Sequence, residues 1–166
     1  QPTPAKISGV IEEIYFKGDR FMPYIRKMTY EKIPSLYLEN KRGSTDLDRL
    51  GLSGLFNFPK SVTFLKRFLS TLNLADNHII LDFFSGSATT AQAVMELNAE
   101  DGGTRRYIMV QAPEPLDTKS SAYQAGYKSI CDIGKERIRR AAAKIKTETG
   151  AEIDYGFRVF RVDEED

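Results

Sequence analysis

Cysteine, histidine and long apolar runs are scarce in this chain of 166 residues, and each shortage excludes a class of protein. The single cysteine, Cys131, excludes a disulfide framework and a cysteine-based zinc site, and it suits a reducing cytoplasm. The single histidine, His78, excludes a histidine metal cluster. No stretch is long and apolar enough to span a membrane. These observations favour a cytoplasmic domain and predict no metal ligands.

The bulk composition fits one domain with a real core, because 41% of the residues are hydrophobic. The formal net charge is +1, which argues neither for nor against a polyanionic partner. The chain opens with Gln-Pro-Thr-Pro and has no initiator methionine. We therefore expect a piece excised or processed from a longer protein.

Residues 7–16 alternate loosely and predict a strand. Residues 21–38 are aromatic and basic and are interrupted by prolines, which predicts irregular, partly extended structure. From residue 55 onward the helix and strand patterns are clearer. Ser61 is a candidate N-cap. The expected elements are an extended segment at 56–60, a helix after Ser61, a strand at 78–84, a helix at 89–98, a strand at 106–111, a helix at 123–146 and a strand near 157–162. A strand–helix–strand order demands a parallel pairing. The fold class predicted is three-layer α/β, with a mainly parallel sheet flanked by helices.

The most informative stretch is DFFSGSATT, residues 82–90, which follows an apolar strand and leads into a helix. It is either an ordinary strand-to-helix connection or a cradle for a polar, partly anionic ligand. The cradle is favoured by Gly86, which permits close approach of the backbone, and by the free N–H groups at the helix start. Ser85 and Ser87 add hydroxyls, and Asp82 adds an acceptor.

The residues of this loop and of the next strand also discriminate between cofactors. No lysine follows Gly86, which argues against a phosphate-gripping nucleotide loop, and a dinucleotide fingerprint needs three spaced glycines. NAD also favours an acid at the end of the second strand, where this chain has Gln111. A smaller cofactor with one carboxylate, one ammonium and a nucleoside fits better, and S-adenosylmethionine carries those groups.

DFFSGSATT resembles the cofactor motif Asp-x-Phe-x-Gly-Ser-Gly-Thr-Thr of amino-group DNA methyltransferases, and FNFPKS at 56–61 resembles their Pro-x-Lys-Pro segment. Downstream, RRYIMVQAPE, ICDIGKERIRRAAAKI and GFRVFRVD resemble the methylation (Mod) subunit of type III restriction-modification systems. The resemblance runs from about Ser44 to Asp163, with its blocks in order at natural spacing. It implies a partly complete Rossmann-like methyltransferase lobe at 44–166, with 1–43 as the tail of an upstream recognition region.

The resemblance also implies a function: a DNA methyltransferase subunit that transfers a methyl group from S-adenosylmethionine to adenine N6. Its implied partners are double-stranded DNA, a restriction subunit and, for the full-length protein, a second copy of itself. Lys60 would be a counter-ion for the cofactor carboxylate, and Gln111 would bind the ribose hydroxyls. The cofactor-binding residues carried over are Phe56, Asn57, Lys60, Asp82, Phe83, Phe84, Ser85, Gly86, Ser87, Thr89 and Gln111.

Two residues depart from the family pattern. Ala88 replaces a glycine, which is harmless only if its φ is negative. Ser61 replaces a proline and is expected to cap a helix instead. The basic run Lys135–Lys146 either is a solvated helix face or binds DNA phosphates, and the solvated face is favoured.

The catalytic segment of this family is missing, because no Pro-Pro dipeptide occurs in the chain. In the matching subclass that segment lies N-terminal to the cofactor motif, so we assign no catalytic residue and expect this chain alone to be inactive. Three alternatives stay open at this point: a non-catalytic fragment that docks the restriction subunit or a second Mod chain, a methyltransferase acting on cytosine N4, and an unrelated nucleotide-binding oxidoreductase.

Overall fold

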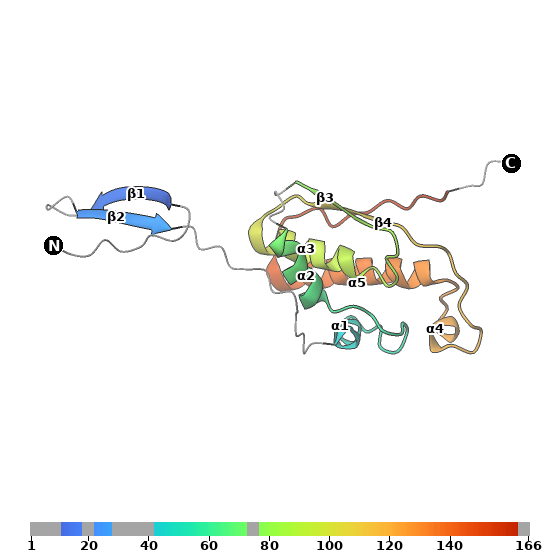
Figure 1. The fold of residues 1–166 in the computed structure, drawn as a ribbon. Helices are drawn as coiled ribbons and strands as arrows, with labels where there is room; N and C mark the ends of the chain where they lie inside the picture. Colours follow the sequence, from blue (N-terminus) through green and yellow to red (C-terminus); the bar gives the residue numbers. More distant parts are fainter. Residues whose placement is uncertain (1–10, 18–21, 28–41, 73–76, 163–166) are drawn as a thin grey trace. The chain divides into compact units, whose positions relative to one another are not determined.

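The computed structural model describes residues 11–17, 22–27, 42–72 and 77–162, which belong to two units, 1–36 and 37–166. In the first unit, β1 (Ile11–Lys17) and β2 (Met22–Lys27) form an antiparallel pair (Figure 1). The strand predicted at 7–16 is thus confirmed over most of its length. A second strand occupies part of the stretch predicted to be irregular, because it finds a pairing partner in β1.

The second unit contains the predicted strand–helix–strand arrangement. Strand β3 (Ile79–Asp82) pairs in parallel with β4 (Arg106–Met109), and α3 (Thr89–Asp101) connects them. Ile79 lies opposite Arg106 and Asp82 opposite Met109, so both strands end at the same edge. This edge positions the loop that follows β3.

The remaining helices of this unit are α1 (Gly43–Arg49), α2 (Val62–Thr71), α4 (Ser121–Gln124) and α5 (Ile130–Thr149). Helix α3 packs against both α2 and α5, and this placement buries nearly its whole first half (Figure 1). Ser61 caps α2 as predicted, since its hydroxyl accepts from the backbone N–H of Phe64 at 3.3 Å. The main core lies where leucines of α1 and of the turn after it meet α3 and α5.

The two faces of the small sheet differ in exposure. Ile80, Tyr107 and Met109 are partly buried against the helices. On the opposite face Ile79, Leu81, Ile108 and Val110 stay about half exposed. The described residues therefore form two layers, a helical layer and a parallel sheet, and the third layer that the sequence predicts is not among them.

Three local predictions were wrong. The single helix expected at 123–146 is two helices, because Gly126 has a positive φ of 99° after α4 and a capping box of Ser129 and Asp132 starts α5. The strand expected near 157–162 is not formed, since those residues join neither β3 nor β4 by a ladder. Phe58 was expected to be extended before Pro59 but has a left-handed φ of 55°.

Two searches of the described residues were negative. None of their helices is long and apolar enough to cross a membrane. Within the same residues, no group of three or more His, Cys, Asp or Glu side chains is arranged to hold a metal ion.

Candidate functional site

The loop between β3 and α3 is held by its own backbone. The N–H of Ser85 donates to the carbonyl of Val110 at 3.2 Å, and the N–H of Ala88 donates back to Ser85 at 2.7 Å. Gly86 and Ala88 both take left-handed conformations, with φ of 51° and 60°. The condition that made Ala88 harmless is therefore not met, and this residue carries a backbone strain of about 1–2 kcal/mol.

Polar side chains predicted from the sequence hold the loop from both strands. The Gln111 Oε1 accepts from the Gly86 N–H at 2.8 Å. The Asp82 carboxylate accepts from the Phe84 N–H at 3.2 Å and from the Thr90 hydroxyl at 2.6 Å. Each oxygen still has a lone pair for a ligand, because a carboxylate or amide oxygen accepts more than one hydrogen bond. The structure thus brings Asp82, Gly86 and Gln111 together.

Phe56 comes from a segment 30 residues upstream of Gly86 and packs against the loop. A Cβ added at Gly86 would lie 3.1 Å from Cζ of the Phe56 ring, which is closer than ordinary van der Waals contact. Glycine is therefore required at this position both for its positive φ and for the space beside the ring. The contact joins two of the sequence blocks from which the site was predicted.

The other predicted residues divide into exposed and buried sets. Phe83 and Phe84 are 63% and 91% exposed, and Asn57 and Lys60 are also exposed. No hydrogen bond between described residues joins the side chains of Asn57 or Lys60 to the loop. Large exposed aromatic side chains beside a backbone cradle are suited to contact an apolar or aromatic ligand surface.

Ser87 and Thr89 lie beneath the loop, only 2% and 5% exposed, where both meet Arg137 of α5. Arg137 Nη1 donates to Ser87 Oγ at 2.9 Å and to Thr89 Oγ1 at 2.6 Å, and its Nε donates to Gln92 Oε1 at 2.9 Å. Arg137 lies in the basic run 135–146, for which a solvated helix face was favoured, and at this residue that prediction is wrong because the side chain is fully buried. An arginine on the apolar face of a predicted helix, together with Ile133 and Ile138, was the signal that could have found it.

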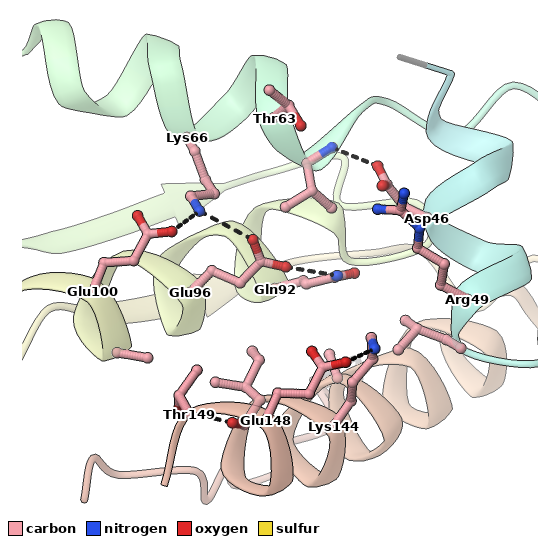
Figure 2. Close-up of a pocket in the computed structure, with 15 residues that line it drawn as sticks. Asp46, Arg49, Thr63, Lys66, Gln92, Glu96, Glu100, Lys144, Glu148 and Thr149 are labelled. Carbon is pink, nitrogen blue, oxygen red and sulfur yellow. Dashed lines mark hydrogen bonds and ion pairs between the residues drawn. The ribbon is translucent and has the colours of Figure 1, made fainter. Parts of the chain in front are cut away.

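A separate cleft lies between α1, α2, α3 and α5, with a volume of about 550 Å³ (Figure 2). None of the predicted site residues lines this cleft. Lys66 points between Glu96 and Glu100 and is bonded to both, and Lys144 is bonded to Glu148 (Figure 2). Burial lowers the pKa of Lys66, but the two carboxylates outweigh it and leave a net rise. Both lysines of the cleft are thus paired with carboxylates that line it.

Cys131 lies on the far side of Gln111. Its Sγ donates to the Gln111 carbonyl at 3.4 Å, and burial raises the pKa of the thiol. The thiol is therefore less prone to ionise than a free cysteine, which favours a structural role over a nucleophilic one.

Comparison with known proteins identifies the family of this chain. Residues 11–144 match the family model N6_N4_Mtase, described as DNA methylase. The Mod subunit of the type III restriction-modification enzyme StyLTI of Salmonella typhimurium is 41% identical over 123 residues, 74% of this chain and 19% of that protein. The Mod subunit of EcoPI from Escherichia phage P1 is 37% identical over 116 residues, 70% of this chain and 18% of that protein.

A type II methyltransferase, M.KpnI of Klebsiella pneumoniae, is 34% identical over 104 residues, 63% of this chain and 24% of that protein. The chain spans about a fifth of the length of the Mod subunits that it matches. The family model covers most of the described residues, including the loop after β3, Arg137 and the segment with Phe56. The chain therefore belongs to the N6_N4_Mtase family of DNA methylases.

Proposed function

We propose that this chain is the S-adenosylmethionine-binding part of a type III restriction-modification DNA methyltransferase. The observation that carries the proposal is the loop at 82–90, where Gly86 packs against the Phe56 ring and the Asp82 and Gln111 side chains hold the turn from the strand ends. The family match and the similarity to Mod subunits support it. A Rossmann-like fold, with a third layer over the exposed sheet face, is part of the same proposal.

The residues of the loop fit this cofactor. Phe83 would lie along the adenosine, and the Asp82 carboxylate would accept from the ammonium group. The N–H groups at the start of α3 would bind the carboxylate, because unpaired amides and the helix dipole favour an anion there. Lys60 and Gln111 keep the roles that the resemblance assigns to them.

When bound, S-adenosylmethionine supplies an electrophilic methyl group. This chain's own residues would hold and orient that donor, and the base would be bound by groups that the Pro-Pro-aromatic segment of this family provides. Positioning the two reactants is a large part of such a transfer. We accordingly propose that this chain alone is inactive and that methyl transfer to double-stranded DNA requires the rest of a Mod subunit. The proposed protein partners are a second Mod copy and a restriction subunit. Adenine N6 is the favoured target over cytosine N4.

The test is calorimetric titration of the folded 166-residue chain with S-adenosylmethionine and with S-adenosylhomocysteine. We expect saturable binding of one molecule per chain. Titration with NAD is the matched control, because it distinguishes an oxidoreductase. Absence of binding by a chain whose circular dichroism shows it folded would overturn the proposal, as would preference for NAD.

A second candidate is favoured by the half-exposed apolar face of Ile79, Leu81, Ile108 and Val110. Contiguous exposed apolar side chains are typical of surfaces that a partner covers. In this reading the chain is an interaction fragment that docks the restriction subunit or a second Mod chain. Co-elution with a restriction subunit in size-exclusion chromatography, lost in Leu81→Lys, together with no cofactor binding, would favour the second candidate over the first.

A further inference from the structure

Arg137 is the most unusual charged residue of the described chain. It is completely buried, at 0% exposure, beneath the loop of Gly86. All three of its hydrogen bonds end on neutral groups, the hydroxyls of Ser87 and Thr89 and the amide of Gln92. Its Nη2 is buried and has no hydrogen-bond partner. A buried guanidinium is normally paired with a carboxylate, so this arrangement is expensive to maintain.

The guanidinium nevertheless keeps its proton at neutral pH. Burial lowers the pKa of Arg137 to about 10, and the longer-range attraction of Asp46 and Glu96 limits the fall. Both carboxylates line the cleft, as does Gln92, and neither is within hydrogen-bond distance of the guanidinium. On the loop side, the guanidinium meets only hydroxyls, so its positive charge is not neutralised by a direct partner there.

The hydrogen bonds of Arg137 also fix the shape of the loop. Ser87 and Thr89 flank Ala88, whose left-handed φ of 60° is strained for a residue with a Cβ. Anchoring both neighbours to one planar guanidinium restrains that turn. With Arg137 donating to both hydroxyls, each hydroxyl proton is directed away from the guanidinium. The two oxygens lie 3.5 Å apart, so one hydroxyl can donate to the other and the remaining proton can donate elsewhere.

We propose that Arg137 is a positioning residue, which fixes the loop through Ser87 and Thr89 and provides an unneutralised positive charge that selects a ligand carrying a carboxylate. The inference rests on the proposed function, in which the loop binds the amino-acid end of S-adenosylmethionine. The charge adds to that of the α3 N-terminus, since both favour an anion. Arg137 does not itself touch the ligand, and its effect is on which ligand is preferred.

The experiment compares two nucleosides on the 166-residue chain. S-adenosylhomocysteine has the carboxylate, whereas 5′-methylthioadenosine lacks the amino-acid end but shares the adenine, the ribose and the thioether sulfur. In Arg137→Met the affinity for S-adenosylhomocysteine should fall about tenfold or more, as expected for loss of a nearby charge in a partly buried site. The affinity for 5′-methylthioadenosine should change much less. Arg137→Lys, which keeps the charge, should restore most of the preference.

A second variant avoids removing the arginine. Gln92→Glu has nearly the same shape and places a carboxylate against Nε of Arg137, where the amide oxygen now lies at 2.9 Å. Pairing should neutralise the guanidinium and reduce the preference for S-adenosylhomocysteine. Arg139→Gln is the matched control, because Arg139 lies on the same helix but is exposed, and its loss should leave the preference unchanged.

The outcomes separate the two proposals. If the wild-type chain is folded and binds neither nucleoside, the proposed function and this inference are both wrong. If the wild-type chain binds and a folded Arg137→Met loses affinity equally for both nucleosides, Arg137 is only structural and the inference alone is wrong. Should Arg137→Met not fold, Gln92→Glu decides: an unchanged preference overturns the inference, and a reduced one supports it.

Discussion

The loop after β3 and the cleft between the helices differ in whether a buried cation has a carboxylate partner. In the cleft, Lys66 lies between Glu96 and Glu100, and these partners produce a net rise in its pKa. Under the loop, Arg137 has only hydroxyls and an amide as direct partners, and its pKa is lowered to about 10. Charged side chains that are paired with one another gain little from a charged ligand. A buried charge without an ion-pair partner is stabilised by a ligand of opposite sign. The smaller loop is therefore the better candidate for a binding site than the larger cleft.

The largest effect is expected on the cleft side, at Gly43. A Cβ there would lie 2.1 Å from the Pro59 carbonyl oxygen and 2.4 Å from that of Lys60, so the backbone must move. We expect Gly43→Ala to lower the free energy of unfolding by about 3 kcal/mol, measured by urea denaturation. Gly54→Ala is the control, because nothing lies within 4 Å of its added Cβ, and it should cost clearly less. Equal costs would contradict the steric explanation.

Two glycines with positive φ, Gly86 and Gly102, can be compared to separate the effect of the Phe56 contact from that of backbone strain. Gly86→Ala and Gly102→Ala should each lose about 1–2 kcal/mol of stability from backbone strain. Only at Gly86 does the added Cβ meet a ring, Phe56 at 3.1 Å, whereas Gly102 has open space. Titration should therefore show weaker S-adenosylhomocysteine binding in Gly86→Ala alone. Equal binding by the two variants would show that the loop is not the binding site.

Helix α5 contributes residues both to the cleft and to the packing beneath the loop, and the capping box at its N-terminus is sensitive to acid. The pKa of Asp132 is lowered from 3.8 to about 2. The largest cause is the Lys135 side chain, and the backbone N–H groups of Lys128 and Ser129 contribute less. Because the folded-state pKa is depressed, this stabilisation is present above about pH 4 and is lost as the pH falls through about 2. Asp132→Ala should remove about 1 kcal/mol at pH 7 and less at pH 2, by urea denaturation. A difference independent of pH would contradict this assignment.

The smallest effect should come from the paired lysine of the cleft. Lys66→Met removes partly exposed ion pairs, which contribute at most about 1 kcal/mol. Its thermal midpoint should change little, and its preference between S-adenosylhomocysteine and 5′-methylthioadenosine should not change. A shift of that preference as large as in Arg137→Met would mean that the cleft and the loop do not differ in the way described.

Sequence reasoning found the local features of this fold because local physics decides them. The apolar strand followed by DFFSGSATT identified β3 and its loop, and Ser61 was predicted as the cap of α2. It failed at 123–146, where apolar periodicity continued through Gly126 and concealed a break between two helices. It also overestimated the terminal strand, because alternation alone does not provide a pairing partner.

The amino-acid sequence alone determined most of the strands and helices, where α2 begins and where the loop after β3 lies. Those features depend on neighbours along the chain, through side-chain periodicity, capping and glycine. Only the tertiary structure decided that Phe56 contacts Gly86, that Gln111 holds the loop, and that Arg137 lies unpaired beneath it. Contacts between residues 25 to 50 positions apart depend on how helices and strands pack, so no local pattern could encode them.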